Sequence, residues 1–320
     1  MKHNQLKELI KNSKKILLLA HINPDGDALG SLSALYTAIY DNFKKKSDII
    51  ITGHFPSSYK FLPNLTDAKK EFEPSLVYDL VITVDVASED RLADSKILFD
   101  KAKTKVNIDH HKTNTGFGNL NFIEPNASSA GEVLLGIFNE LELNISLDCA
   151  TALYVAILTD TGGFKYENTS SNVFKSAAQL VEIGINPNKL YKACYESKTK
   201  DFVMFQNYCI NKAEFLYDNK VAYSTVYKKD LEKFNAQDDF TEGLVETLRE
   251  IVTTDISFLA KEIDNKTTKM SMRSKKTDVA KICLAFGGGG HTHAAGCTIK
   301  SNMDNAIKKL LKVIEENIDG

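Results

Sequence analysis

The sequence predicts an α/β fold, with a mainly parallel sheet flanked by helices, followed by a second, smaller α+β domain. In the first half of the chain, short apolar runs alternate with stretches of helical periodicity, as in βαβ units. In the second half, two alternating segments flank a polar turn, which is typical of an antiparallel hairpin. The length of 320 residues is sufficient for two domains.

The elements of the first half follow in order. Apolar runs predict strands at 16–20, 49–52, 80–84 and 106–108, and helical periodicity predicts helices at 29–43 and 130–141. The apolar stretch 147–158 is ambiguous between strand and helix, but Ser146 directly before it is typical of a helix N-cap. We therefore expect a helix here, ending near Thr159 and Asp160.

The stretch 170–216 has helical periodicity throughout, broken by Gly184 and Pro187, and we expect the domain boundary within it. The predicted organisation is a first domain at 1–185, a helical linker at 186–216 and a second domain at 217–320. In the second domain we expect, in order, a strand at 221–227, a helix around 241–251, a hairpin of 256–263 and 268–273, a helix at 278–286, a glycine-rich segment at 287–296, a short strand and a helix at 304–318.

Composition and charge exclude several classes of protein. The 40 basic and 42 acidic residues give a net charge of −2, which provides no global attraction to long duplex DNA. The five cysteines contain no C-x-x-C pair, so we expect buried, reduced thiols rather than disulfides or a thiolate zinc site. No apolar run approaches the roughly 18 to 20 residues of a membrane span, and we find no secretory signal. These features predict a cytoplasmic protein.

The loop after the first predicted strand carries a dense group of candidate metal ligands. His21 ends the strand, and Asp25 and Asp27 flank Gly26 in a turn where a helix begins, at or just after Asp27. In an open α/β sheet, ligands bind beyond the carboxyl ends of the strands. Taken alone, this loop is equally compatible with a structural turn in which Asp27 is only an N-cap.

The same placement recurs further along the chain. Asp85 directly follows the third predicted strand, and Asp109, His110 and His111 directly follow the fourth. Asp160 is a further candidate, although its surroundings also fit a simple helix stop. Carboxylates with a minority of imidazoles suit a hard or borderline divalent cation such as Mn²⁺ or Mg²⁺. If one aspartate bridges two such cations, the site becomes a two-metal clamp for phosphoryl chemistry.

Together these motifs resemble those of the DHH phosphoesterase superfamily, in the same order along the chain. They comprise His21-x-x-Pro-Asp25-x-Asp27-Ala, Asp85, Asp109-His110-His111 and Asp160. The run 287–296 is similar to the glycine-rich signature of the associated DHHA1 domain, and 270–274 is similar to the arginine-bearing strand before it. The matching residues extend over most of the chain.

The resemblance implies a role for each matching residue of the first domain. Six would be metal ligands, namely His21, Asp25, Asp27, Asp85, His110 and Asp160. One cation would be held by His21 and Asp25 and the other by the remaining ligands, with Asp85 as the bridge. Asp109 would orient a neighbouring histidine, and His111 would face the substrate phosphate, so that the catalytic residues are His111, Asp85 and Asp109. The cofactors would be two divalent cations, Mn²⁺ in preference to Mg²⁺.

The glycine-rich run and Arg273 are candidate substrate-binding residues. Consecutive glycines can take positive φ and bring N–H groups close to an anion without obstruction by Cβ atoms. Arg273 could clamp a terminal phosphate through its planar fork. The alternatives are a flexible linker for the glycines, an exposed strand arginine, and a loop histidine at His293. The candidates are Arg273, Gly288, Gly289, Gly290 and His291, with Gly287 at the start of the run.

The resemblance implies a phosphoesterase with its active site in the cleft between the two domains. Two-domain members resemble bifunctional oligoribonucleases, which degrade RNA of a few nucleotides to mononucleotides and convert 3′-phosphoadenosine 5′-phosphate (pAp) to AMP. The expected partners are short single-stranded RNA or a dinucleotide, and pAp, with no membrane; a homodimer is compatible with the family. The alternatives are a phosphodiesterase for cyclic di-AMP or its linear product pApA and, less favoured, a non-catalytic nucleotide or RNA sensor.

Overall fold

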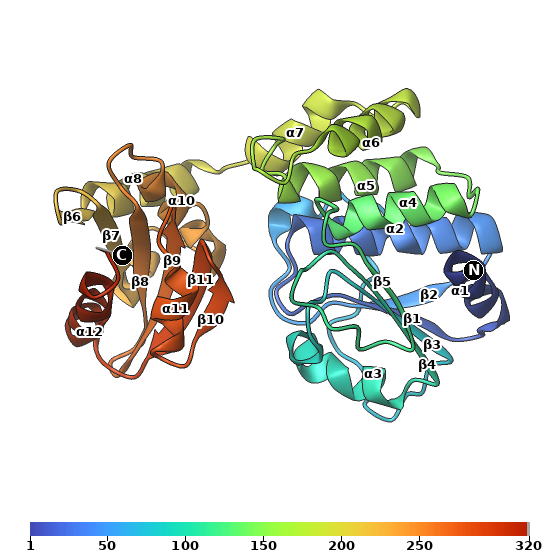
Figure 1. Ribbon diagram of the computed structural model, residues 1–320, viewed down its shortest axis with the longest axis horizontal. Helices are drawn as coiled ribbons and strands as arrows, with labels where there is room; N and C mark the ends of the chain where they lie inside the picture. The colour runs from blue at the N-terminus through green and yellow to red at the C-terminus, as the bar shows by residue number, and fades with distance from the viewer. Residues whose placement is uncertain (319–320) are drawn as a thin grey trace. The chain divides into compact units, whose positions relative to one another are not determined.

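A computed structural model of the protein describes residues 1–318 (Figure 1). The chain forms two compact units, Met1–Ser197 and the part from Lys198 onward, and the division lies within the stretch 186–216. Helix α7 (Pro187–Tyr195) packs on the first unit through Leu190, whereas α8 (Lys200–Asn211) packs on the second through Phe205 and Cys209. No helix within residues 1–318 is long and apolar enough to cross a membrane.

A five-stranded parallel sheet forms the centre of the first unit, in the order β2-β1-β3-β4-β5. Its strands are β1 (Ile16–Leu19), β2 (Ser47–Ile50), β3 (Leu80–Val84), β4 (Thr104–Asp109) and β5 (Leu120–Ile123). The register pairs Leu18 with Ile82 and Ile82 with Val106, so the carboxyl ends of β1, β3 and β4 lie at the same edge. This confirms the predicted parallel sheet. The strand β5 was not predicted, because Asn121 interrupts its short apolar run.

Helices cover both faces of this sheet (Figure 1). Leu18 and Ile82 face a layer made of α1 (Lys2–Asn12), α2 (Gly26–Phe43), α4 (Ala130–Glu140) and α5 (Leu147–Asp160). Leu17 and Val81 face the opposite layer, which contains the 3-10 helix η2 (Glu89–Ser95) and α3 (Lys96–Lys101). Helices α6 (Ser171–Glu182) and α7 pack on the outside of α5, and η1 (Ser57–Tyr59) is a single turn in the segment between β2 and β3. The alternation of buried side chains follows from the two-residue period of a strand.

The first residues of α5 and α2 can be compared with the helix starts predicted from the sequence. The helix α5 confirms the helical prediction for 147–158, and the side chain of Ser146 accepts a hydrogen bond from the Cys149 N–H. The helix α2 begins earlier than predicted, because Asp25 rather than Asp27 is its N-cap and accepts a hydrogen bond from the Ala28 N–H at 3.1 Å. Asp27 therefore lies inside the first turn of α2.

The second unit contains a mixed six-stranded sheet in the order β10-β11-β9-β8-β7-β6. Only β7 and β8 pair in parallel within it. The strands are β6 (Glu214–Leu216), β7 (Val221–Val226), β8 (Ile256–Asp264), β9 (Thr267–Ser274), β10 (Gly289–His291) and β11 (Ala294–Ile299). The helices are α8, α9 (Lys228–Lys233), η3 (Asp238–Thr241), α10 (Leu244–Arg249), α11 (Val279–Leu284) and α12 (Met303–Glu315).

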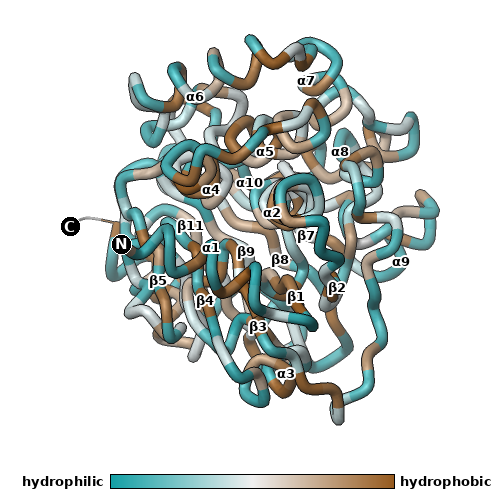
Figure 2. The backbone as a smooth tube through the Cα atoms, turned by 90° about the vertical axis from the view of Figure 1, so that its right-hand side faces the viewer, coloured by the Kyte–Doolittle hydropathy of each residue, from teal (hydrophilic) through white to brown (hydrophobic). Residues whose placement is uncertain are grey.

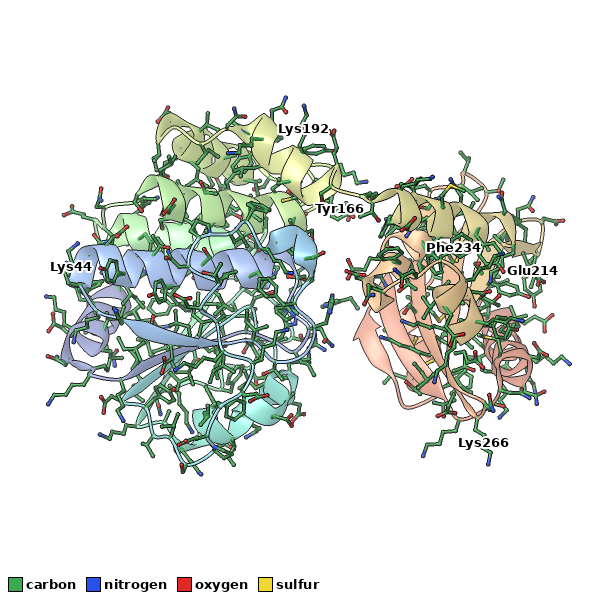
Figure 3. The ribbon with its side chains drawn as sticks, turned by 180° about the vertical axis from the view of Figure 1, so that it is seen from behind. Lys44, Tyr166, Lys192, Glu214, Phe234 and Lys266 are labelled. Carbon is green, nitrogen blue, oxygen red and sulfur yellow. The ribbon has the colours of Figure 1, made fainter. Side chains whose placement is uncertain are left out.

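The hairpin prediction is confirmed by β8 and β9, which pair antiparallel around a turn that carries Lys266, seen at the edge of this unit in Figure 3. Two other details of the prediction for the second half of the chain were wrong. Residues 214–216 form an edge strand rather than the end of a helix, because they pair with β7. Residues 289–291 form the strand β10 rather than a loop, because they pair with β11.

Among the described residues, each unit has hydrophobic clusters of its own, two in the first unit and two in the second. Apolar residues colour most of β1 and β3 of the first sheet brown in Figure 2, and they pack with the layers of α2 and α3 described above. In the second unit, Phe258, Met270, Met272 and Leu310 belong to a core between the sheet and helices α11 and α12. Burial of apolar area on this scale is the main stabilising contribution to each unit.

Candidate metal centre

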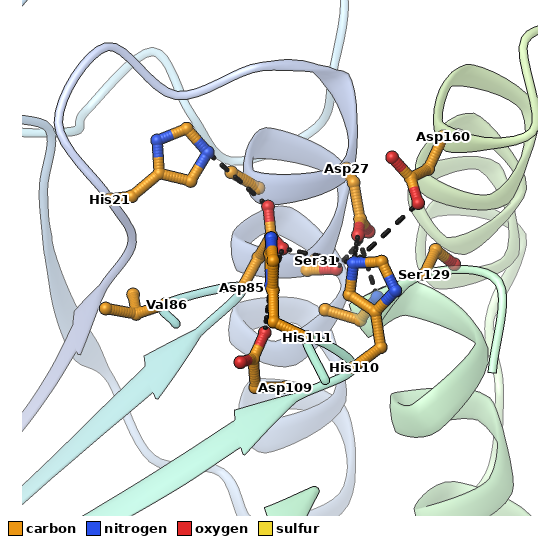
Figure 4. A network of polar contacts seen from close by, with 12 residues as sticks. His21, Asp27, Ser31, Asp85, Val86, Asp109, His110, His111, Ser129 and Asp160 are labelled. Atoms are coloured by element: carbon orange, nitrogen blue, oxygen red, sulfur yellow. Dashed lines mark hydrogen bonds and ion pairs between the residues drawn. The ribbon is translucent and has the colours of Figure 1, made fainter. Parts of the chain in front are cut away.

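Five of the predicted ligands lie where a strand or helix ends at one edge of the first sheet (Figure 4). His21 follows β1, Asp85 follows β3 and His110 follows β4. Asp27 lies in the first turn of α2, and Asp160 is the last residue of α5. Because the carboxyl ends of parallel strands share one edge, the topology brings together side chains that are far apart in the sequence.

A first group of ligand atoms surrounds one oxygen of Asp85. The Nε2 atom of His21 lies 3.5 Å from Asp85 Oδ2 and 3.9 Å from Asp25 Oδ1. One ligand atom from each of these three residues lies within 4.8 Å of the other two. The side chain of Asp25 is exposed, whereas that of His21 is only 11% exposed. The group is therefore open to solvent on the side of Asp25.

A second group surrounds the other oxygen of Asp85. The Nε2 atom of His110 lies 3.5 Å from Asp85 Oδ1, 3.7 Å from Asp27 Oδ2 and 3.7 Å from Asp160 Oδ2. Figure 4 shows Asp85 between His21 and His110. Asp85 Oδ2 thus faces His21 and Asp85 Oδ1 faces His110, which is the arrangement that a bridging ligand requires.

The structure also brings Asp109 and His111 to this edge, in a different arrangement. Asp109 is fully buried, and its Oδ1 lies 2.8 Å from His111 Nδ1. Its Oδ2 accepts a hydrogen bond from Asn114 Nδ2 at 2.6 Å. His111 Nδ1 lies 3.6 Å from Asp85 Oδ1. Asp109 is thus held from both sides and fixes the orientation of the His111 ring.

The position of Asp27 depends on the start of another helix. Its Oδ2 accepts a hydrogen bond from the Ala130 N–H at 2.7 Å, and its Oδ1 accepts from the Gly131 N–H at 3.0 Å and from Ser31 Oγ at 3.1 Å. These backbone donors belong to the first turn of α4, where N–H groups lack partners within the helix. Through these hydrogen bonds, the carboxylate of Asp27 holds the first turn of α2 against the first turn of α4.

Gly26 allows α2 to approach the end of α5. A Cβ atom at this position would lie 2.5 Å from Thr159 Oγ1, in the residue directly before Asp160. Real Cβ contacts are longer than this, so only glycine permits the observed approach. Asp85 itself adopts a left-handed backbone conformation, with φ of 56°. Such a conformation is uncommon for a residue other than glycine and is more frequent at functional sites.

Without cations the cluster retains protons at neutral pH. Burial alone would lower the pKa of His110, but Asp85 and Asp27 outweigh it and raise this pKa to about 10. The pKa of His21 is raised to about 8, because Asp85 and Asp25 likewise outweigh burial. Burial, together with the neighbouring carboxylate of Asp85, raises the pKa of Asp160 to about 7. Crowded carboxylates and imidazoles of this kind are typical of sites that exchange protons for metal ions.

The donor set fits a pair of divalent cations. Asp85 Oδ1 is buried and has no hydrogen-bond partner within residues 1–318, although a buried carboxylate oxygen is costly to leave unsatisfied. The ring nitrogens of His110 and His111 lie 3.5 and 3.6 Å from it. Oxygen donors with a few imidazoles suit Mn²⁺ or Mg²⁺ better than a metal that prefers thiolates. A cation bound by Asp85 would satisfy this oxygen.

The predicted substrate-binding residues lie together in the second unit. Strand register places His291 opposite Ala294, and Ala294 opposite Arg273, on three adjacent strands. Arg273 already has partners, because its Nε lies 2.8 Å from Glu246 Oε1 and its Nη1 donates to the Met272 carbonyl at 2.9 Å. Gly290 has φ of 146°, which is readily accessible only to glycine. His293 is not solely a solvated loop residue, since its Nδ1 lies 3.1 Å from Ser274 Oγ.

Sequence reasoning missed three contributors to the site. Asn114 orients Asp109, the first turn of α4 holds Asp27, and Arg91 lies beside His21 with its Nη2 at 3.3 Å from His21 Nδ1. The capping pattern Ser129-x-x-Glu132 could have located the start of α4, but not its contact with Asp27. No sequence signal distinguishes Arg91 from an ordinary surface arginine.

Comparisons with known proteins agree with this architecture. The model of the DHH family, N-terminal domain, matches residues 15–157, and the model of the DHHA1 domain matches residues 218–320. The probable bifunctional oligoribonuclease and PAP phosphatase NrnA of Streptococcus mutans is 30% identical over 313 residues, which cover 95% of this chain and 97% of that protein. The bifunctional oligoribonuclease and PAP phosphatase NrnA of Thermus thermophilus is 27% identical, with 95% and 90% covered.

The structure is also similar to a solved one. The crystal structure of an exopolyphosphatase-related protein from Bacteroides fragilis superimposes with a TM-score of 0.92 at 25% sequence identity. The superposition covers 98% of this chain and 96% of that one. Sequence and structure comparisons therefore agree over almost the whole length.

Proposed function

Because this chain belongs to the DHH family and carries a DHHA1 domain, we propose that it is a metal-dependent phosphoesterase that hydrolyses short RNA oligonucleotides to mononucleotides and converts pAp to AMP. The relatives from Streptococcus mutans and Thermus thermophilus, which carry this pair of activities in their names, support the substrate class. We propose that the chain acts in the cytoplasm.

One observation carries the proposal: the two oxygens of Asp85 face two separate groups of ligands. A bridging carboxylate of this kind suits a two-metal hydrolase, whereas a simple nucleotide-binding protein has no need of one. When bound, a pair of divalent cations activates water and neutralises charge on the phosphate oxygens. We propose His21, Asp25 and Asp85 as ligands of one cation, and Asp27, Asp85, His110 and Asp160 as ligands of the other, with Mn²⁺ preferred to Mg²⁺.

His111 would supply a proton to the leaving oxygen. Its Nδ1 is engaged by Asp109 at 2.8 Å, so the proton exchanged with the substrate belongs to Nε2. Burial alone would lower the pKa of His111, but Asp109 and Asp85 outweigh it and raise this pKa. A raised pKa favours the protonated ring, which is the form that a general acid requires.

The second unit would bind the rest of the substrate. We propose that Arg273 and the segment from Gly288 to His291 bind a phosphate, through a guanidinium fork and through backbone N–H groups. For this role Arg273 would exchange its present partner, Glu246, for the substrate phosphate. The net charge of −2 favours such local recognition of a short substrate over tracking along a long strand.

A comparison of substrates tests the proposed function. The full chain, loaded with Mn²⁺, is incubated with 5′-labelled RNA of two to about ten nucleotides, pAp, pApA and cyclic di-AMP, and the products are separated. We expect the highest kcat/KM with the shortest RNAs, hydrolysis of pAp, and no turnover after removal of the metal by a chelator. Faster hydrolysis of cyclic di-AMP or pApA would favour the alternative phosphodiesterase. Absence of turnover with all four substrates would favour a non-catalytic sensor.

A further inference from the structure

Arg91 lies next to the first ligand group, in a segment with a fixed backbone. It belongs to η2, and its carbonyl accepts a hydrogen bond from the Ile22 N–H at 2.8 Å. The following residue, Leu92, is fully buried in the core formed with Leu17, Leu98 and Phe99. One side of the segment is thus tied to the loop that carries His21, and the other to the core.

The side chain of Arg91 points to the same loop. Its Nη2 lies 3.3 Å from His21 Nδ1, and that nitrogen also lies 2.9 Å from the Ile22 carbonyl oxygen. These two contacts require opposite protonation states of one nitrogen. A carbonyl can only accept, so Nδ1 must carry a proton to bind Ile22, whereas a guanidinium can only donate, so Nδ1 must offer a lone pair to bind Arg91.

The environment of Nε2 decides between the two states. Nε2 faces Asp85 and Asp25, at 3.5 and 3.9 Å. If His21 is a metal ligand through Nε2, its proton must lie on Nδ1 and be donated to Ile22. Arg91 then has no acceptor in His21. Within residues 1–318, no carboxylate or carbonyl oxygen accepts a hydrogen bond from its side chain.

A guanidinium in this position is suited to an anion that approaches the cations. It is exposed, permanently charged and adjacent to His21 of the first ligand group. The four aspartates balance two divalent cations, so a phosphate ester bound there would add uncompensated negative charge. A planar guanidinium neutralises such charge through paired hydrogen bonds to two phosphate oxygens.

We propose that Arg91 is a substrate-binding residue whose guanidinium binds oxygens of the scissile phosphoryl group beside the ligand group of His21, Asp25 and Asp85. The inference rests on the phosphoesterase function proposed above. The alternative is that Arg91 is a positioning residue, which would hold the His21 ring by donating a hydrogen bond to Nδ1. That alternative places a proton on Nε2 and so opposes binding of a cation there.

Binding of inorganic phosphate and of Mn²⁺ separates these roles. Titration calorimetry of the Mn²⁺-loaded full chain with inorganic phosphate is compared for the wild type, Arg91→Gln and Arg91→Lys. We expect Arg91→Gln to weaken phosphate binding by about 10- to 100-fold, and Arg91→Lys to weaken it less, since lysine keeps the charge but not the fork. Mn²⁺ affinity, measured on the metal-free chain by paramagnetic resonance, should change by less than about twofold.

Lys96→Gln is the matched control. It removes a positive charge from the adjoining helix, but Lys96 pairs with Glu89 and Asp100 instead of the cluster, so phosphate binding should be unchanged. Unchanged phosphate affinity in Arg91→Gln, no phosphate binding by the wild type, or an equal loss of Mn²⁺ affinity would each overturn the proposal. If the wild type binds phosphate through Arg91 but hydrolyses none of the four substrates, the proposed function fails and the binding role of Arg91 remains.

Discussion

Asp85 unites the two ligand groups, and its substitution should affect both. Burial alone would raise the pKa of Asp85, but His110 and His21 outweigh it and hold this pKa below its usual range, so the carboxylate is charged and available to cations. Asp85→Asn removes that charge while preserving size. We expect kcat to fall by more than about a hundredfold, since loss of a residue that only orients a ligand already costs about 10- to 100-fold.

Steady-state kinetics in saturating Mn²⁺ measures this effect, with Asp100→Asn as the control. Asp100 is also an aspartate of the first unit, but it is exposed and pairs with Lys96. Near-normal turnover of Asp85→Asn would contradict the bridging role. A comparable loss in both variants would indicate a general effect of charge.

The protonation of the ligands predicts how metal affinity depends on pH. With pKa values of about 10 for His110, 8 for His21 and 7 for Asp160, the first two are largely protonated at pH 7 and the third is about half protonated. Cations bind the deprotonated ligands, so binding must release protons and must strengthen as pH rises from about 6 to 9. Calorimetry of Mn²⁺ binding in two buffers of different ionisation enthalpy measures the protons released. Binding enthalpies that do not depend on the buffer would contradict this prediction.

At the scale of secondary structure, the contact between α2 and α5 positions Asp27 and Asp160. A Cβ atom at Gly30 of α2 would lie 2.7 Å from the Ala152 carbonyl oxygen and 2.8 Å from the Ala156 amide nitrogen, both in the backbone of α5. Gly30→Ala should therefore force the helices apart and lower the free energy of unfolding by about 1 to 3 kcal/mol. It should also weaken Mn²⁺ binding, because each helix carries a proposed ligand.

Urea denaturation measures this change, and Gly136→Ala supplies the control. Gly136 lies in α4 with no atom within 4 Å of its virtual Cβ, so alanine there should raise the free energy of unfolding by about 0.5 to 1 kcal/mol. Equal stability of Gly30→Ala and the wild type would contradict this prediction, because α5 would then accommodate the added methyl group without loss of stability.

The sequence predicted long, strongly patterned elements better than short ones. The amphipathic and apolar helices α4 and α5 and the buried strands β1, β3 and β4 have patterns that local sequence determines. The strands β6 and β10 have three residues each, and each exists because it pairs antiparallel with the strand that follows it, β7 and β11 respectively. Such pairing depends on hydrogen bonds to a neighbouring strand, which the periodicity of a three-residue run does not encode.

At the scale of the whole molecule, the second unit should contribute to substrate affinity rather than to chemistry. Arg273→Ala should raise KM for substrates with a terminal phosphate and leave kcat nearly unchanged, which is a loss of uniform binding. Its partly exposed ion pair with Glu246 should cost no more than about 1 kcal/mol of stability. Steady-state kinetics with pAp measures the split between KM and kcat.

Glu246→Gln is the matched variant for this experiment. It breaks the same ion pair but keeps the guanidinium, so KM should stay the same or fall. If kcat of Arg273→Ala collapsed at constant KM, Arg273 would belong to the chemistry. If both variants raised KM equally, substrate affinity would depend on the ion pair between Arg273 and Glu246 and not on the guanidinium alone.

The positions of strand ends and the residue types beside them were sufficient to predict the candidate metal ligands. Of the six predicted ligands, His21, Asp85 and His110 meet because a parallel sheet collects its carboxyl ends at one edge, which follows from the pattern of the first half. The contacts of Asp27 with α4, of Asn114 with Asp109 and of Arg91 with His21 depend on loop paths. No periodicity specifies those paths, so these residues emerged only from the structure.

Anomalous diffraction at the manganese edge from crystals of the full chain soaked in MnCl₂ tests the central claim most directly. We expect two peaks roughly 3.5 to 4 Å apart, each contacted by one oxygen of Asp85. His21 and Asp25 should complete the first, and Asp27, His110 and Asp160 the second. A single peak that Asp85 does not contact, or no peak among these side chains, would contradict the account.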